Sequence, residues 1–320
     1  MSGRFPVLRP YTADAVGLLQ IKTRRRLLAL GAAVPAALIG TLVLAPVASA
    51  GWFLPEAGGS PNADSIRTLY ILIALVALVI FVAVEGLLIY SMIRFRAKKG
   101  MVAAQIHGNT QLEIGWTVGA AAILIFLTVF TFVLLDDIKN PAASQIDANG
   151  NPVASNNIYA ASDQPPPPDA SDSLNIRVVG EQYSWSFFYP QEEGQGRVYS
   201  YNDMYVPVGM TITLEVQSKD VAHSWWIPKL GGKADAIPGL TNKTWFQIPL
   251  DVLGDKDRVI FEGQCAELCG RNHADMLGRV IGLPFDEWQA WRDQKAEDLA
   301  TAQDEAAAER ERLNSSEEGR

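Results

Sequence analysis

Cysteine and histidine are scarce in this chain of 320 residues, which holds two cysteines and three histidines. No C-x-x-C-H run occurs, so the chain carries no covalently attached c-type haem. Basic residues are outnumbered, with 27 Lys and Arg against 35 Asp and Glu, and the net charge of −8 argues against nucleic acid as a partner. Charged residues make up only 19% of the chain and hydrophobic residues 48%, which excludes wholesale disorder.

The first fifty residues have the features of a targeting segment. Three consecutive arginines at 24–26 precede an uncharged stretch from residue 27 to residue 50, which closes with Ala48, Ser49 and Ala50. A small-x-small ending is typical of a signal-peptidase site, so residues 1–50 are predicted to be a cleaved signal peptide with an N-terminal extension. A retained membrane helix is the alternative, because the apolar run is long for a signal peptide.

Two further apolar runs, at residues 69–93 and 114–135, predict membrane-spanning helices. A spanning helix needs about 20 apolar residues, and both runs have that length. Residues 51–137 are therefore predicted to form a transmembrane helical hairpin. The loop between the runs is basic, with Arg94, Arg96, Lys98 and Lys99, and should face the cytoplasm, which places everything after the second run on the outer side.

The rest of the chain divides into a linker, a folded domain and a tail. Residues 138–172 are rich in Pro, Asn, Ser and Ala and are predicted to be an extended linker without a core. Residues 173–291 predict an all-β sandwich or barrel, because short β-branched or aromatic runs are separated by turn residues. These runs lie at residues 174–180, 184–189, 197–202, 211–216, 244–248, 258–263 and 277–283. A helix is predicted from residue 284 onward, and residues 292–320 form a charged tail.

The segment most informative about function runs from residue 265 to residue 276. It contains Cys265, Cys269, His273 and Met276, and His223 lies upstream in an H-S-W run. Thiolates, imidazoles and a thioether together favour copper over harder ions. A mononuclear blue-copper site uses one Cys, whereas two thiolates four positions apart could bridge two copper ions, each with one His and one weak ligand. A disulfide between the two cysteines and a zinc site are the alternatives.

The pattern C-x-E-x-C-x-x-x-H-x-x-M with the upstream H-S-W resembles the binuclear copper A site of cytochrome c oxidase subunit II. The resemblance extends over residues 65–291 and implies a membrane-anchored all-β fold. Two transmembrane helices would precede a cupredoxin-like Greek-key β-sandwich or barrel. It also implies that Cys265 and Cys269 bridge two copper ions, and that His223 and His273 ligate one copper each.

Two weaker ligands follow from the same resemblance. Met276 would be a weak ligand of one copper, and the backbone carbonyl of Glu267 a weak ligand of the other. The Glu267 carboxylate would also reach a magnesium ion at the interface with subunit I.

Other motifs resemble the family at its contacts with subunit I. Lys233-Ala-Asp235-Ala-Ile-Pro-Gly matches a K-x-D-x-x-P-G segment, which implies a place for Asp235 in a water-filled exit path; a Pro-Gly turn accounts for the same residues. Glu113, at the start of the second run, matches a Glu at the mouth of a proton channel, and a solvated helix-start Glu is the alternative. Glu85 lies within the first run, where a structural hydrogen bond is favoured over a role in proton uptake.

The aromatic stretch Gly-Glu-Gln-Tyr183-Ser-Trp185 resembles the family with one departure. The family usually has Trp, which takes the electron from cytochrome c, where this chain has Tyr183. Tyr183, Trp185 and Trp226 are therefore the residues through which electrons are predicted to enter, with a core aromatic role as the alternative for each.

The resemblance implies subunit II of a cytochrome c oxidase, a subunit of an enzyme whose oxygen chemistry occurs in subunit I. The chain would accept electrons from cytochrome c at the copper A centre and pass them to haem in subunit I, where oxygen is reduced and protons are pumped. Its partners would be subunit I, other oxidase subunits, cytochrome c and membrane lipid. We expect a multi-pass protein of the bacterial plasma membrane with its copper domain outside. The alternatives are a copper A subunit of a nitric oxide reductase and a membrane-anchored copper-binding or delivery module.

Overall fold

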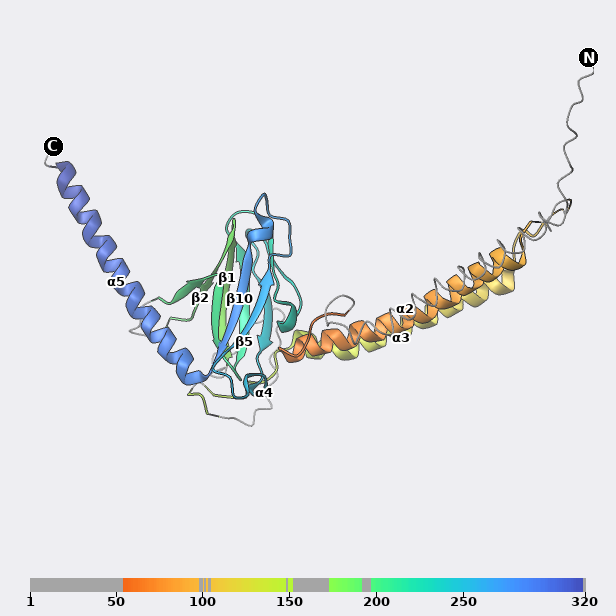
Figure 1. Cartoon of the computed structure of the whole chain (residues 1–320), viewed down its shortest axis with the longest axis horizontal. Coiled ribbons are helices and arrows are strands. Elements are labelled where there is room, and N and C mark those ends of the chain that lie inside the picture. Colours follow the sequence, from red (N-terminus) through yellow and green to blue (C-terminus); the bar gives the residue numbers. More distant parts are fainter. Residues whose placement is uncertain are drawn as a thin grey trace, which may run out of the picture. The chain divides into compact units, whose positions relative to one another are not determined.

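The computed structural model describes residues 54–97, 100, 102, 105–147, 149–151, 173–191 and 197–318. The signal peptide predicted for residues 1–50 lies outside the described residues, as do residues 152–172 of the predicted linker. Along the described chain, two long helices are followed by a β domain and a C-terminal helix (Figure 1).

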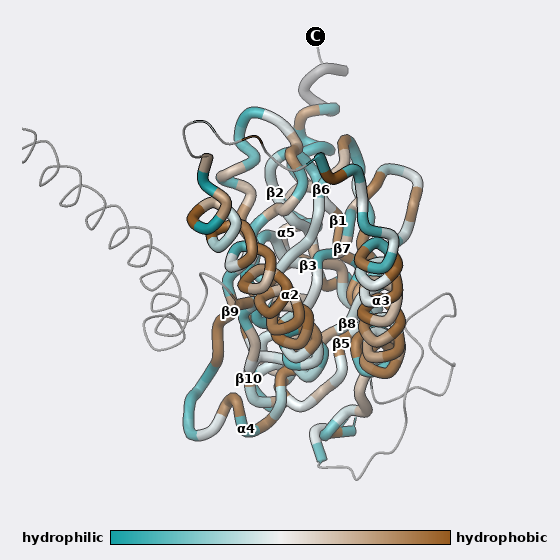
Figure 2. Tube along the Cα trace, turned by 90° about the vertical axis from the view of Figure 1, so that its right-hand side faces the viewer, coloured by the Kyte–Doolittle hydropathy of each residue, from teal (hydrophilic) through white to brown (hydrophobic). Residues whose placement is uncertain are grey.

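Helices α2 (Pro61–Arg94) and α3 (Thr110–Lys139) form the transmembrane pair. A proline begins α2, and the Asn109 side chain caps α3 by accepting a hydrogen bond of 3.1 Å from the Leu112 amide. Both helices are brown along most of their length in the hydropathy view (Figure 2), and no side chain of α3 is buried. Helices that expose apolar side chains all round suit lipid rather than water, and both are long and apolar enough to cross a membrane. The prediction of two membrane spans is confirmed.

Short strands make up the β domain. They are β1 (Ser173–Glu181), β2 (Ser184–Phe188), β3 (Tyr199–Tyr201), β4 (Asp203–Pro207), β5 (Thr211–Ser218), β6 (His223–Trp225), β7 (Ala234–Ala236), β8 (Asn242–Gln247), β9 (Val259–Gln264) and β10 (Leu277–Leu283). Short helices η2 (Pro228–Leu230), α4 (Leu250–Leu253) and η3 (His273–Asp275) lie in the connections. The prediction of an all-β domain after the two spans is confirmed, although β4, β6 and β7 have no counterpart among the predicted runs.

Within the described residues, the strands pair into three sheets. The largest has the order β3-β2-β1-β5-β8, the second has the order β4-β10-β9, and β6 pairs with β7. Strand β1 runs parallel to β5 and β10 parallel to β4, whereas the other pairs are antiparallel. Figure 1 labels β1, β2 and β5 of the largest sheet and β10 of the second sheet within the domain.

The core is built from alternating strand positions. In β5, Ile212, Leu214 and Val216 are buried, and the residues between them are partly exposed. In β2, Trp185 and Phe187 are fully buried. Burial of one such side chain stabilises the fold by about 1.5–3 kcal/mol, so this core holds the strands and the loops between them in fixed relation.

The N-cap residue and the first turn of α2 are bonded to the outer side of β8, an edge strand of the largest sheet. Ser60 Oγ accepts a hydrogen bond of 3.1 Å from the Gln247 amide, and Asn62 Nδ2 donates one of 2.8 Å to the Trp245 carbonyl. The Trp245 indole donates in turn to the carbonyl of Ile138, in α3, at 2.9 Å. Because Ser60, Asn62 and Gln247 are buried, these bonds join the helical hairpin firmly to the β domain.

The segment after α3 differs from the predicted linker of residues 138–172. Residues 138 and 139 still belong to α3. Ile146 is only 3% exposed and belongs to the core of the β domain. The Gln145 amide donates to the Gly209 carbonyl at 2.7 Å, and Ser144 Oγ accepts from the Thr211 amide at 2.8 Å. A single isoleucine among polar residues carries no periodic signal, which is why composition did not reveal this segment as part of the domain.

Helix α5 (Phe285–Glu318) follows β10. Its first turns contact the β domain, where the Trp288 indole donates to the Tyr205 carbonyl at 3.1 Å and Trp291 stacks on the Tyr205 ring at 4.4 Å between centroids. From residue 301 to residue 314 every side chain is exposed. Among the side chains of α5 that the structure describes, those in the first part of the helix therefore anchor it to the β domain.

Candidate metal centre

Two segments bring the candidate ligands together. His223 begins the short strand β6 and is completely buried. Cys265, Cys269, His273 and Met276 lie in the loop that joins β9 to β10. The ladder pair of Gln264 and Leu277 closes this loop, and the Cys265 amide donates to the Met276 carbonyl at 2.9 Å. A twelve-residue loop pinned at its base can hold several ligands near one point.

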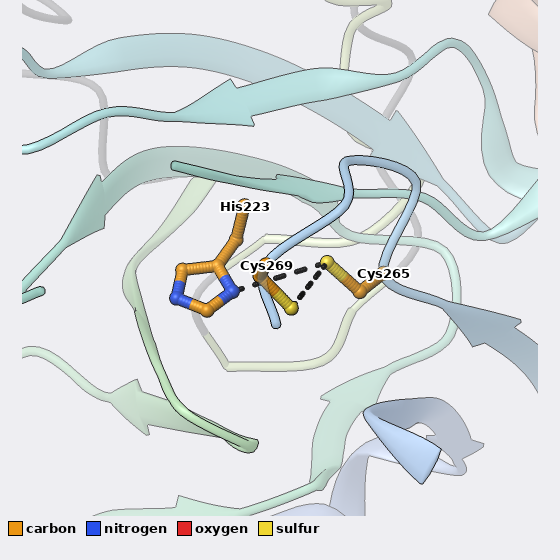
Figure 3. A group of neighbouring side chains, drawn as sticks. All are labelled: His223, Cys265 and Cys269. Atoms are coloured by element: carbon orange, nitrogen blue, oxygen red, sulfur yellow. Dashed lines mark hydrogen bonds between the residues drawn. The ribbon is translucent and has the colours of Figure 1, made fainter. Parts of the chain in front are cut away.

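The ligand atoms of His223, Cys265 and Cys269 lie within 4.8 Å of one another. Figure 3 shows the two sulfur atoms and the imidazole Nδ1 pointing toward one another. Cys265 Sγ lies 3.9 Å from Cys269 Sγ and 3.9 Å from His223 Nδ1. A disulfide requires about 2.05 Å between sulfurs, so the two cysteines are free thiols. A metal–thiolate bond is about 2.3 Å long, so two sulfurs at this separation can reach the same ion.

The remaining candidate ligands border the same cluster. Cys269 Sγ lies 3.5 Å from His273 Nδ1 and 3.8 Å from Met276 Sδ. The Glu267 carbonyl oxygen lies 3.2 Å from Cys265 Sγ, while the Glu267 residue is exposed. The structure therefore brings all six residues of the predicted metal site together.

Burial shapes the chemistry of the thiols. Cys265 and Cys269 are 3% and 4% exposed, and Met276 is fully buried. Loss of solvent, together with the neighbouring Cys265, raises the pKa of Cys269 to about 11. Without a metal this thiol keeps its proton at neutral pH, and a bound cation would have to displace that proton.

Asp220 orients the buried histidine. Its Oδ1 lies 2.8 Å from His223 Nε2, and its two oxygens also accept from the backbone amides of Val221 and Gln182 at 2.6 Å and 2.7 Å. Partial burial pushes the pKa of Asp220 upward, but these hydrogen bonds outweigh it and lower the pKa to about 2. Since an ionised carboxylate can only accept, the imidazole proton sits on Nε2 and the lone pair of Nδ1 faces the sulfurs, as a metal ligand requires.

Close packing fixes the ring of His223. Trp185 meets it edge-on at 5.9 Å between centroids and meets Trp225 at 5.2 Å. A Cβ atom at Gly180, on the neighbouring strand β1, would lie 3.0 Å from His223 Cδ2. This strand can approach the ring so closely because residue 180 has no side chain.

The three predicted electron-accepting aromatics have different surroundings. Trp185 is fully buried and cannot meet a donor protein at the surface. Tyr183 is half-buried, and a Cβ atom at Gly270 would lie 2.6 Å from its hydroxyl, so its ring rests against the loop that carries Cys269. Trp226 is half-buried beneath Lys233, whose ammonium lies 4.7 Å from the ring centroid.

The two predicted path residues lie in different parts of the structure. Asp235, on β7, is exposed, and its side chain accepts a hydrogen bond of 2.9 Å from Ser224 Oγ on the strand that carries His223. Glu113 lies in the first turn of α3, where its Oε1 accepts from the Asn109 amide at 3.3 Å. Among the described contacts, none joins Glu113 to the β domain.

Two contributors were not predicted from the sequence, namely Asp220 and Gln182. An Asp three residues before a candidate His ligand is a signal that could have found Asp220. Nothing in the sequence around Gln182 indicates its contact with Asp220, because 38 residues separate them.

Comparisons with known proteins match most of the described chain. The profile "Cytochrome C oxidase subunit II, transmembrane domain" matches residues 48–134, and "Cytochrome C oxidase subunit II, periplasmic domain" matches residues 191–281. The chain is 34% identical over 234 residues to cytochrome c oxidase subunit 2 of Alkalihalophilus pseudofirmus, which is 71% of this chain and 56% of that one. It therefore spans little more than half the length of that relative.

Two more proteins show the same likeness. Cytochrome c oxidase subunit 2 of Cereibacter sphaeroides is 29% identical over 279 residues, which is 76% of this chain and 79% of that one. A crystal structure of the periplasmic domain of subunit II of cytochrome oxidase from Bradyrhizobium japonicum is 31% identical, covers 39% of this chain and 94% of that one, and has a TM-score of 0.34.

Proposed function

We propose that this chain, which belongs to the cytochrome c oxidase subunit II family, is the electron-accepting subunit of a haem–copper oxidase and holds a binuclear copper A centre. It is a membrane protein with two transmembrane helices and a periplasmic domain. The observation that carries the proposal is the buried cluster in which His223, Cys265 and Cys269 converge, bordered by His273 and Met276.

The donor set fits copper. Cys265 and Cys269 would bridge the two ions, His223 and His273 would each ligate one, and Met276 and the Glu267 carbonyl would be the weak ligands. When bound, the copper pair supplies a one-electron acceptor in which both nuclei share the electron. Soft sulfur donors select copper, and zinc would leave the thioether of Met276 without a suitable role.

The surrounding residues would keep the site ready for fast electron transfer. Asp220 holds the tautomer of His223, and Trp185 and Gly180 confine its ring. The burial of both thiols would keep water away from a bound metal. A rigid, dry ligand set changes little on gaining an electron, and that keeps the barrier to transfer low.

The electron donor would be a cytochrome c that docks near the β1–β2 turn. Residues 173–291 carry 15 acidic and 10 basic side chains, which favours a cationic partner. Tyr183 is the best-placed of the three aromatics, because it is partly exposed and rests on the loop that carries Cys269. The electron would then pass to haem in subunit I, where oxygen is reduced to water and protons are pumped.

Contacts with subunit I would involve three carboxylates. The carbonyl of Glu267 faces the sulfurs while the residue is exposed, so its carboxylate is free to help bind magnesium at a subunit interface. Asp235 is exposed and lies next to Ala236, the residue that pairs with His223 between β6 and β7. This is a suitable place for a water path. Glu113 would serve proton uptake at the opposite end of the hairpin.

A copper-delivery module is the weaker interpretation of this site. Delivery needs exposed and exchangeable ligands, whereas His223, Cys265 and Cys269 are buried. A nitric oxide reductase subunit would use the same copper ligands, and the carboxylate positions Glu113 and Asp235 are what favour an oxidase.

Copper content and electron paramagnetic resonance of the full chain in detergent test the proposal. We expect two coppers per chain and a hyperfine pattern from one electron shared equally by both. Cys269→Ser should abolish the shared signal, and Leu268→Ala, a change of an exposed residue in the same loop, should retain it. One copper, zinc, or a shared signal that survives Cys269→Ser would overturn the assignment.

A further inference from the structure

The turn between β1 and β2 touches the metal centre without supplying a ligand to it. The turn consists of Gln182 and Tyr183. Gln182 Nε2 donates a hydrogen bond of 2.6 Å to the Cys269 carbonyl. The backbone amide of Gln182 donates one of 2.7 Å to Asp220 Oδ2, and the other oxygen of Asp220 pairs with His223. Gln182 therefore stands between two segments that carry ligands.

We infer that Gln182 is a positioning residue of the metal centre, which holds the Cys269 half of the ligand loop in register with His223. The inference rests on the proposed function, since the centre it serves is the proposed copper site. It assigns a role to a residue that lies outside the candidate ligands and is largely exposed.

The two halves of the ligand loop are held differently. The Cys265 half is bonded directly to β6, because the Ala266 amide donates to the Ser224 carbonyl at 2.9 Å. Residues 267–275 make their other described hydrogen bonds only within the loop. Within the part of the chain that the structure describes, the bond from Gln182 is thus what ties this half to another element. Without it, no described hydrogen bond would hold Cys269 to an element outside the loop.

The backbone of the loop is shaped to accept this contact. Gly270 has a φ of +130°, and a Cβ atom there would lie 2.9 Å from Gln182 Nε2 and 2.6 Å from the Tyr183 hydroxyl. Only a residue without a side chain lets the turn lie this close to the loop. The close approach of the turn to the loop and the short hydrogen bond between Gln182 and Cys269 occur at the same place, which indicates a specific contact.

The chemistry of the side chain makes the inference specific. A neutral amide donates to a carbonyl oxygen, whereas an ionised glutamate of nearly the same shape can only accept. Partners beyond the ligands themselves orient those ligands, and their loss typically costs about ten- to hundredfold in metal affinity. A Cys269 sulfur released from its position would also make the two coppers unequal, because each sulfur is shared by both.

The test compares three variants of the full chain in detergent. Gln182→Met removes the donor, and Gln182→Glu removes it while keeping the shape. Gln217→Met is the matched control, because Gln217 Nε2 donates to Thr241 Oγ1 at 2.8 Å and none of the described hydrogen bonds joins its side chain to the loop. The measurements are the rate of copper release to a chelator, the hyperfine pattern of the copper-loaded chain, and the rate at which the metal-free thiols react with a thiol reagent.

Both changes at Gln182 should speed copper release about ten- to hundredfold, make the hyperfine pattern unequal and speed thiol modification, while Gln217→Met matches the unsubstituted chain. Variants at Gln182 that match the control would refute the inference. So would an effect confined to Gln182→Met, because Glu cannot donate to the Cys269 carbonyl. If the unsubstituted chain does not show the two-copper signal, the proposed function is refuted instead. The rate of thiol modification in the metal-free variants would then still decide the role of Gln182.

Discussion

Replacement of Asp220 by asparagine is expected to weaken copper binding by about tenfold to about a hundredfold. The carboxylate accepts from His223, from the Gln182 amide and from the Val221 amide. An asparagine side chain has one acceptor oxygen, and its amide nitrogen must face one of these donors, so at least one hydrogen bond is lost. A hydrogen bond to a charged group contributes about 1.5–3 kcal/mol, and 1.4 kcal/mol corresponds to about tenfold.

The direction follows from the histidine tautomer. A neutral amide is a weaker acceptor for Nε2–H than a carboxylate, so the imidazole proton can move more readily to Nδ1, which faces Cys265 Sγ at 3.9 Å and is the atom needed for the metal. Metal binding is then weaker, because the proton must first return from Nδ1 to Nε2.

A competition titration of the full chain against a copper chelator measures the change. Asp251→Asn, which removes the same charge from an exposed position in α4, is the control and should leave the affinity unchanged. Equal affinities for Asp220→Asn and Asp251→Asn would refute the reasoning that Asp220 orients His223.

Three further outcomes are expected. Ile146→Ala should lower the free energy of unfolding in urea by about 2–5 kcal/mol, because Ile146 is 3% exposed. Ile260→Ala, at a residue that is 48% exposed, should lower it much less. Equal effects of the two changes would contradict the place of Ile146 in the core. Glu181→Lys should slow oxidation of cytochrome c at low salt and have little effect at high salt, and rates that do not change with salt would contradict the docking proposal. Burial raises the pKa of Tyr189 above its ordinary value of 10.0, so the folded state keeps a proton that the unfolded state loses. The stability this residue contributes is full below about pH 10 and falls as the pH rises further, and Tyr189→Phe should flatten that alkaline decline in a pH series of unfolding curves.

Spacing along the chain was enough to place four candidate ligands on one loop. Cys265, Cys269, His273 and Met276 lie within twelve residues, and the loop that joins two paired strands keeps neighbours in sequence close in space. The membrane spans were equally predictable, because uninterrupted apolar runs of that length are typical of membrane-crossing helices. The seven predicted strand runs coincide with strands for the same reason, since their residues are β-branched or aromatic.

Contacts between distant segments could not be predicted in this way. The strand that carries His223 has three residues, too few for any period to appear. Gln182 reaches Cys269 across 87 residues, and only the folded sheets reveal that contact. Trp185 illustrates the same limit, because the sequence of a short strand does not show whether an aromatic residue faces solvent or the core.

The attachment of Ser60 and Asn62 to β8 has a consequence for aggregation. An edge strand offers unpaired backbone groups to any other strand that approaches it, and proteins cover such edges to prevent intermolecular pairing. Here the cover is supplied by the start of the first membrane helix, where Ser60 accepts from the Gln247 amide and Asn62 donates to the Trp245 carbonyl. A water-soluble fragment that begins at residue 173 would lose this cover and also Ile146. Such a fragment would expose β8 to pairing with other copies, whereas a fragment that keeps residues 54–62 and 138–147 alongside the strands would keep this edge covered.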